Sequence, residues 1–219
     1  MLDTDTIMML VEGTRDTLYM TLMSTLFGYV LGLPMGIILT VTDKDGIRPN
    51  AAVYKVLDVI VNILRSVPFL ILLILVMPFT KAVVGKTYGS TATIVPLVIA
   101  AAPFIARMVE SSLKEVDPGV IEAAVSMGAG TGTVIWKVML AEARTSLLVG
   151  VTIAIGTILG YSAMAGTVGG GGLGDIAIQY GYYRYETEIM IVTVVVLVVL
   201  VQILQSIGMM VSRKLDKRK

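Results

Sequence analysis

Long apolar segments alternate with short charged ones along the chain. We place the apolar segments at Leu18–Val41, Val56–Phe79, Thr91–Ala106, Thr145–Val168 and Ile189–Val211. A helix that crosses the hydrocarbon core of a bilayer needs about 20 mostly apolar residues, and several of these segments meet that requirement. The pattern therefore predicts an all-α membrane protein, with five transmembrane helices in a single transmembrane domain that covers residues 1–219.

Small residues recur at helical spacing in the first apolar segment. Gly28, Gly32 and Gly36 are four residues apart, so they line one face of a helix. Small residues on one face let the backbones of two membrane helices approach closely. We expect this face to be a helix-packing surface.

Composition removes most enzyme classes. Hydrophobic residues make up 56% of the chain and charged residues 15%, and the mean hydropathy is +0.86. The chain has no Cys and no His, so disulfides, thiolate nucleophiles, imidazole bases and the usual zinc sites are excluded. The net charge of +1 does not favour nucleic-acid binding. We expect a transport or scaffold protein in contact with lipid, with no catalytic residue, metal or cofactor of its own.

Basic residues predict the orientation in the membrane. Lysine and arginine accumulate in cytoplasmic loops, and most of them follow the first and third apolar segments or the last one. They are Lys44, Arg48, Lys55, Arg107, Lys114, Lys137, Arg144, Arg213, Lys214, Lys217, Arg218 and Lys219. We expect the N-terminus outside and the C-terminus in the cytoplasm.

The cytoplasmic stretch Arg107–Arg144 is far longer than a connection needs. Within it, Asp117 and Pro118 predict the start of a helix and Gly128 its end. Apolar residues recur between them at helical spacing: Val120, Ile121, Ala124 and Met127. A helix lying on lipid is usually rich in Lys and Arg on its polar face, whereas this one carries Glu122. A protein partner is therefore favoured over a lipid surface for the segment 117–128.

The same stretch resembles the EAA pattern of ABC importer permeases, E-A-A-x3-G-x6-I-x4-L-P. Glu122–Ala124 are followed by Gly128, Ile135 and Leu140 at the spacing of that pattern, while Ala141 stands where the family usually has proline. The resemblance implies a coupling helix that docks in a cleft of a separate ATPase subunit. The residues to which it assigns this coupling are Glu122, Ala123, Ala124 and Gly128.

Other segments resemble the permeases of methionine importers in particular. They are Arg65–Phe69, Val95–Leu97, Ala102–Arg107, Gly160–Gly166 and Gly172–Gly174. This resemblance implies a permease of the bacterial cytoplasmic (inner) membrane that transports methionine or a close analogue by alternating access. It further implies a homodimer, two ATPase subunits on the cytoplasmic face that hold ATP and magnesium, and an external substrate-binding protein.

Two sets of residues inside the apolar segments are candidates for a role in transport or assembly. Asp58, Asn62 and Arg65 are spaced i, i+4, i+7 on one helix face, and we interpret them as a polar cluster that holds helices together rather than as a translocation site. Met164, with neighbours Tyr161 and Ser162, lies in a run of small residues. Met164 either lines a constriction of the pathway or fills the core, as a flexible thioether often does.

No nucleotide site is predicted. Gly169–Gly174 satisfies G-x-G-x-x-G but follows a membrane span rather than a strand. We interpret it as a tight turn or a flexible loop. No G-x-x-x-x-G-K-[ST] motif occurs, so ATP must bind another chain. The alternatives are an ABC permease for another small amino acid, an ATP-independent secondary transporter, or a membrane scaffold.

Overall fold

The computed structural model describes residues 3–215, and this part of the chain is helical without a strand. The all-α prediction is therefore confirmed. The basic residues at 217–219 lie outside the described residues. The elements are α1 (Thr4–Thr42), α2 (Ala51–Ser66), α3 (Phe69–Leu75), α4 (Met77–Val84), α5 (Ser90–Lys114), α6 (Pro118–Ser126), α7 (Thr131–Thr133), η1 (Val134–Met139), α8 (Leu140–Glu142), α9 (Arg144–Ala165), η2 (Gly166–Val168), α10 (Gly172–Ile176), η3 (Ala177–Tyr183) and α11 (Thr187–Leu215).

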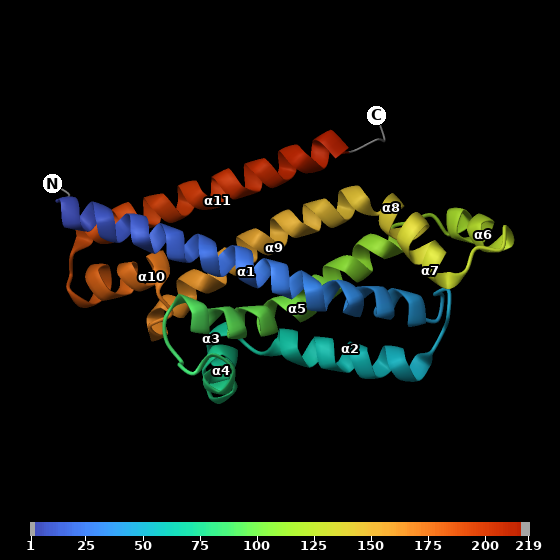
Figure 1. Ribbon diagram of the computed structural model, residues 1–219, viewed down its shortest axis with the longest axis horizontal. Helices are drawn as coiled ribbons and strands as arrows, with labels where there is room; N and C mark the ends of the chain where they lie inside the picture. Colours follow the sequence, from blue (N-terminus) through green and yellow to red (C-terminus); the bar gives the residue numbers. More distant parts are fainter. Residues whose placement is uncertain (1–2, 216–219) are drawn as a thin grey trace.

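Four helical segments are long and apolar enough to cross a membrane, and a bent helix pair would make a fifth span. The four are Thr4–Thr42, Ser90–Lys114, Arg144–Val168 and Thr187–Lys214. Figure 1 shows the N-terminus at one end of the molecule, with α6 and the end of α11 towards the other. α1 begins at Thr4 and α5 continues to Lys114, so both helices are longer than the apolar segments Leu18–Val41 and Thr91–Ala106 suggested.

Close packing of α1 on α5 forms the centre of the fold. A Cβ on Gly32 would lie 2.7 Å from the carbonyl oxygen of Ala102, and one on Gly36 would lie 2.6 Å from that of Ala106. Neither position has room for a side chain. The glycine face is a packing surface, as predicted, and its partner is α5 of the same chain.

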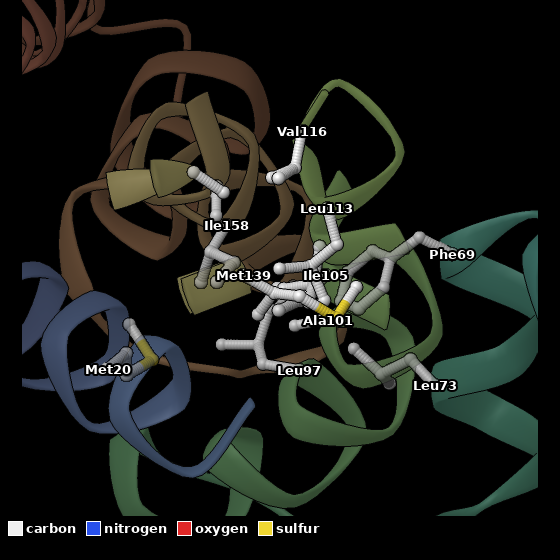
Figure 2. Packing of buried hydrophobic residues seen from close by; sticks show 14 of the residues in the cluster. Met20, Phe69, Leu73, Leu97, Ala101, Ile105, Leu113, Val116, Met139 and Ile158 are labelled. Carbon is white, nitrogen blue, oxygen red and sulfur yellow. The ribbon is translucent and has the colours of Figure 1, made fainter. Parts of the chain in front are cut away.

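The main core surrounds α5. Figure 2 shows Leu97, Ala101 and Ile105 of α5 grouped with Phe69 and Leu73 of α3, and all five are buried in one cluster. Pro96 and Pro103 lie inside α5 without ending it, since neighbouring groups in a membrane bundle can compensate for the lost backbone bonds.

The apolar segment Val56–Phe79, predicted as one span, is divided between separate helices. α2 ends at Ser66, α3 begins at Phe69, and the two axes differ by 104°. Pro68 stands at the break with φ −56° and ψ 134°. The missing N–H of proline and its restriction of the preceding residue explain why this proline ends a helix.

Candidate functional site

Hydrogen bonds define both ends of α6. The Asp117 carboxylate accepts a hydrogen bond from the N–H of Gly119 at 2.7 Å. At the other end, Gly128 has φ +84°, its N–H donates to the carbonyl of Val125 at 2.9 Å, and the N–H of Ala129 donates to that of Ala124 at 3.1 Å. This is the pair of bonds of a Schellman motif, which requires a left-handed residue best supplied by glycine. The start at Asp117 and the stop at Gly128 are as predicted.

The apolar residues of α6 divide between two faces. Ala124 is buried and Ile121 packs beside it against the main core. By contrast, Val120 is 43% exposed and Met127 is 82% exposed. The predicted single apolar face is therefore wrong: Ile121 and Ala124 hold α6 on its own chain, while Val120 and Met127 point away from it.

The exposed side of α6 is an apolar strip suited to contact with another molecule. Val120, Ala123 and Met127 are all exposed, and their i, i+3, i+7 spacing places them on one face. We call these three residues the α6 outer face. Glu122 is exposed on the other side of α6, where it lines an open groove of about 780 Å³ between α6 and the turn after α1.

The rest of the EAA resemblance lies behind α6. Ile135 and Leu140 are partly buried and pack against the main core. The chain stays helical through Ala141 and turns at Ala143. Ile135 and Leu140 thus pack on the same core cluster that contains Ala124 of α6. Ala141, which stands in place of the family's proline, lies inside α8.

A network of polar and charged side chains ties α2 and the turn after α1 to the C-terminal half of α5. Arg107 pairs with Asp58 of α2 and, at 2.6 Å, with Glu110. Lys114 bonds Glu110 at 2.8 Å and Asp43, just after α1, at 2.6 Å. Asn62 completes the set, since its amide nitrogen donates to Asp58 at 3.1 Å and its oxygen accepts from Arg107 at 2.9 Å. We call these six residues the ion network: Asp43, Asp58, Asn62, Arg107, Glu110 and Lys114.

Arg65 does not belong to this network, which corrects the predicted cluster. It is exposed, one helical turn beyond Asn62. The cation that pairs with Asp58 and Asn62 is Arg107, which we had placed in a loop. Arg107, Glu110 and Lys114 are spaced i, i+3, i+7 at the end of an apolar helix. That spacing is the signal in the sequence that could have identified them.

The three candidate gate residues lie in different environments. Met164 is 53% exposed, whereas Ser162 is 1% exposed and its hydroxyl donates to the carbonyl of Leu159 at 2.8 Å. Tyr161 stacks on Phe69, with ring centroids 4.6 Å apart and planes 7° from parallel. Only Met164 presents a free side chain, while Tyr161 joins α9 to α3.

The glycine-rich run after α9 is a tight turn packed on α1 and α5. Gly171 and Gly172 have φ of +80° and +75°, in the region that favours glycine. The N–H of Leu173 donates to the Thr17 hydroxyl of α1 at 2.9 Å, and the Thr93 hydroxyl of α5 donates to the carbonyl of Gly170 at 3.1 Å. The turn is structural, and it fixes the end of α9 that carries Met164.

Comparison with known families agrees with this arrangement. A family model described as "Binding-protein-dependent transport system inner membrane component" matches residues 32–218, which is most of the chain. The chain belongs to this family. Within the binding-protein-dependent inner membrane components, it is 52% identical over 210 residues to a probable D-methionine transport system permease protein of Vibrio cholerae, covering 96% of this chain and 93% of that protein. A methionine import system permease protein of Bacillus subtilis is 46% identical over 94% of this chain and 93% of its own length.

A solved structure from the same family has the same fold. This chain matches a chain in crystals of inward-facing conformations of the MetNI methionine ABC transporter, with a TM-score of 0.97 and 46% identity over 98% of this chain and 100% of that one. Near-complete coverage in both directions leaves no large part of either chain unmatched.

Proposed function

We propose that this chain is the membrane-spanning permease subunit of an ATP-driven importer, and that it translocates methionine or a close analogue by alternating access. The observation that carries this proposal is full-length similarity in sequence and fold to permeases named for methionine transport. Similarity at this level over the whole chain supports a shared substrate class more strongly than the EAA resemblance alone, which is common to many importers.

ATP and magnesium belong to a separate ATPase in this proposal. The sequence contains no phosphate-binding G-x-x-x-x-G-K-[ST] motif, and the α6 outer face offers an exposed apolar surface for a partner. Two ATPase subunits would each hold one α6, with Ala123 in the contact made by the α6 outer face and Glu122 in the contact made by the groove side. Closure of the ATPases would then move both α6 helices together.

The permease acts as a homodimer, because one chain with this few helices cannot enclose a symmetric pathway and twofold assembly is the commonest closed arrangement. The two copies of Met164 would meet near the twofold axis, since this exposed side chain sits among small residues that allow close helix approach. Ser162 takes no part in the pathway, because its hydroxyl is already bonded within the chain.

The N-terminus lies outside and the C-terminus in the cytoplasm of a bacterial inner membrane. This orientation follows from the basic residues, and it puts α6 on the ATPase side. The external substrate-binding protein would deliver methionine to the opposite face. Similarity to inward-facing conformations supports an inward-open state for the arrangement described above.

Uptake into liposomes tests the proposal. The chain, its ATPase and its binding protein would be reconstituted and supplied with a panel of amino acids that includes both methionine enantiomers. We expect uptake of methionine that requires ATP. Preference for another amino acid would reassign the substrate, uptake without ATP would favour a secondary transporter, and no uptake of any kind would leave a scaffold.

Glu122→Lys tests the docking role of α6 in the same assay. Charge reversal on the groove side of α6 should weaken retention of the ATPase on purification and lower ATP-driven uptake about tenfold, which corresponds to about 1.4 kcal/mol. Glu188→Lys is a matched charge reversal in the first turn of α11, far along the chain from α6, and this variant should retain the ATPase. Normal retention and uptake in Glu122→Lys would contradict the docking role.

A further inference from the structure

The cytoplasmic end of α5 is the direct route by which movement of α6 enters the membrane part of the chain. Only residues 115–117 separate the end of α5 at Lys114 from the start of α6 at Pro118. Val116 of this connection is buried in the same core cluster as Ala124 of α6. A displacement of α6 therefore acts first on the end of α5, where the ion network lies.

The ion network attaches α2 to that end of α5. Asp58 and Asn62 of α2 both bond Arg107, while Val61 is the one residue of α2 that is fully buried. Val61 packs in a small cluster with Leu39 and Ala106. Tyr54 and Leu57 of α2 also pack on this cluster but are only partly buried, so the charged contacts add to a small apolar contact between α2 and α5. Glu110, which the network surrounds, is 5% exposed, and removing one member of a buried charged set leaves the others uncompensated.

The other end of α2 reaches the segment that carries Met164. Figure 1 shows α2 running beside α1 from the end that holds α6 towards the middle of the molecule, where the chain bends into α3. Phe69, the first residue of α3, stacks face to face on Tyr161. Tyr161 is three residues before Met164 in α9, so the two lie about one helical turn apart.

We propose that α2 and α3 form a lever between the coupling end and the gate, held by Arg107 at one end and by Phe69 at the other. Arg107 and Phe69 are positioning residues: neither needs to touch the substrate. When α6 and the end of α5 move, the ion network carries α2 with them, and the stack of Phe69 on Tyr161 transfers the displacement to the segment of Met164. This proposal rests on the proposed function and adds the route by which ATP hydrolysis reaches the gate.

The test measures methionine uptake per ATP hydrolysed in liposomes that contain the complete transporter. Arg107→Gln and Phe69→Leu should each lower this ratio about fivefold or more, the size of effect expected when a coupling free energy between two sites is lost. Arg107→Lys should restore part of the ratio because it keeps the charge. Since both ends belong to one lever, the double variant should fall no further than the worse single variant, whereas independent sites would give losses that multiply.

Matched controls separate this effect from general damage. Lys55→Gln removes an exposed cation from α2 outside the ion network, and Phe79→Leu shortens a 56% exposed aromatic side chain of α4. Both should keep the wild-type ratio. If Arg107→Gln does not assemble, Asp58→Asn removes the charge from the α2 side with almost no change in shape, and it should lower the ratio in the same way.

Two results would overturn the lever. One is a parallel fall of uptake and ATP hydrolysis that leaves their ratio unchanged in the assembled variants. The other is a double variant whose loss is the product of the single losses. Failure of the proposed function gives a different result, because the wild-type transporter itself would then show no ATP-driven uptake of methionine. That result would also overturn the lever.

Discussion

The two ends of this permease combine different contacts. At the end that carries α6, the Asp117 cap, the Gly128 stop and the ion network use directional hydrogen bonds and charge pairs. At the opposite end, two hydrogen bonds to the glycine-rich turn are joined by glycines that bring backbones together, and a Cβ on Gly166 would lie 2.2 Å from the carbonyl carbon of Gly174. Directional bonds fix the orientation of a surface that must meet a partner. Glycine contacts instead allow two backbones to pack densely, because no side chain separates them.

Gly128→Val should have the largest effect, because Gly128 has the most restricted backbone conformation at the end of the molecule that carries α6. Valine at φ +84° is strained, at a cost of about 1–3 kcal/mol. We expect dimers that reach the membrane but lose about tenfold or more of ATP-driven uptake, equivalent to about 1.4 kcal/mol or more. Gly130→Val is the control: neither glycine has a neighbour within 4 Å of its Cβ position, but Gly130 has φ −69°. Equal activity of the two variants would show that the Gly128 turn is dispensable.

Met164→Ala probes the glycine-packed end. Loss of the long thioether should widen the constriction, so that leakage of methionine without ATP rises about fivefold, a free-energy change of about 1 kcal/mol. Efflux from preloaded vesicles measures the leak. Ile153→Ala, at a 48% exposed position earlier in α9, should leave it unchanged. A Met164→Ala transporter with normal coupling and no added leak would show that Met164 does not line a constriction.

Gly32→Ala tests whether close backbone contact also holds the middle of the molecule. The new methyl group would meet the carbonyl of Ala102 at 2.7 Å, and overpacking of this kind costs about 1–3 kcal/mol. Thermal unfolding of the purified transporter should shift to lower temperature. Leu31→Ala, at a neighbouring 51% exposed position, should shift it less. The reverse order would mean that lipid-facing bulk matters more than the α1–α5 contact.

The smallest expected effect is on how stability depends on pH, through the ion pair of Asp43 with Lys114. A hydrogen bond from Lys114 lowers the pKa of Asp43 below its ordinary value of 3.8, against a smaller opposing effect of burial. Because the folded pKa is the lower one, this contact stabilises the protein above pH 3.8 and the stabilisation is lost as the pH falls through the folded value.

Asp43→Asn should therefore reduce stability at pH 7 by at most about 1 kcal/mol, since solvent screens the partly exposed Lys114. It should also flatten the loss of stability on acidification, which unfolding measured between neutral and acidic pH would detect. Asp45→Asn serves as the control because the Asp45 side chain is 82% exposed. An unchanged acid limb in Asp43→Asn would show that the Asp43–Lys114 pair contributes nothing.

The sequence predicted local features well at positions where the backbone conformation or the packing accepts only a few residue types. Asp117 and Gly128 marked the limits of α6, and the spacing of Gly28, Gly32 and Gly36 marked a packing face. Prolines were less informative: Pro34 and Pro103 lie inside continuous helices, while Pro68 bends the chain by 104°. Each proline restricts the backbone in the same way, so the packing of neighbouring elements decides whether the helix continues through it.

By itself, the sequence determined that the chain is helical, that it belongs in a membrane and that it carries a short capped helix between the third and fourth apolar segments. These properties follow from hydropathy and from residue chemistry within one or two helical turns. Only the tertiary structure decided that Arg107 rather than Arg65 pairs with Asp58, that Val120 and Met127 face outward, and that Phe69 stacks on Tyr161. Each of these contacts joins residues on different helices or depends on which helix face is covered, and the spacing of residues along one helix does not specify its neighbours.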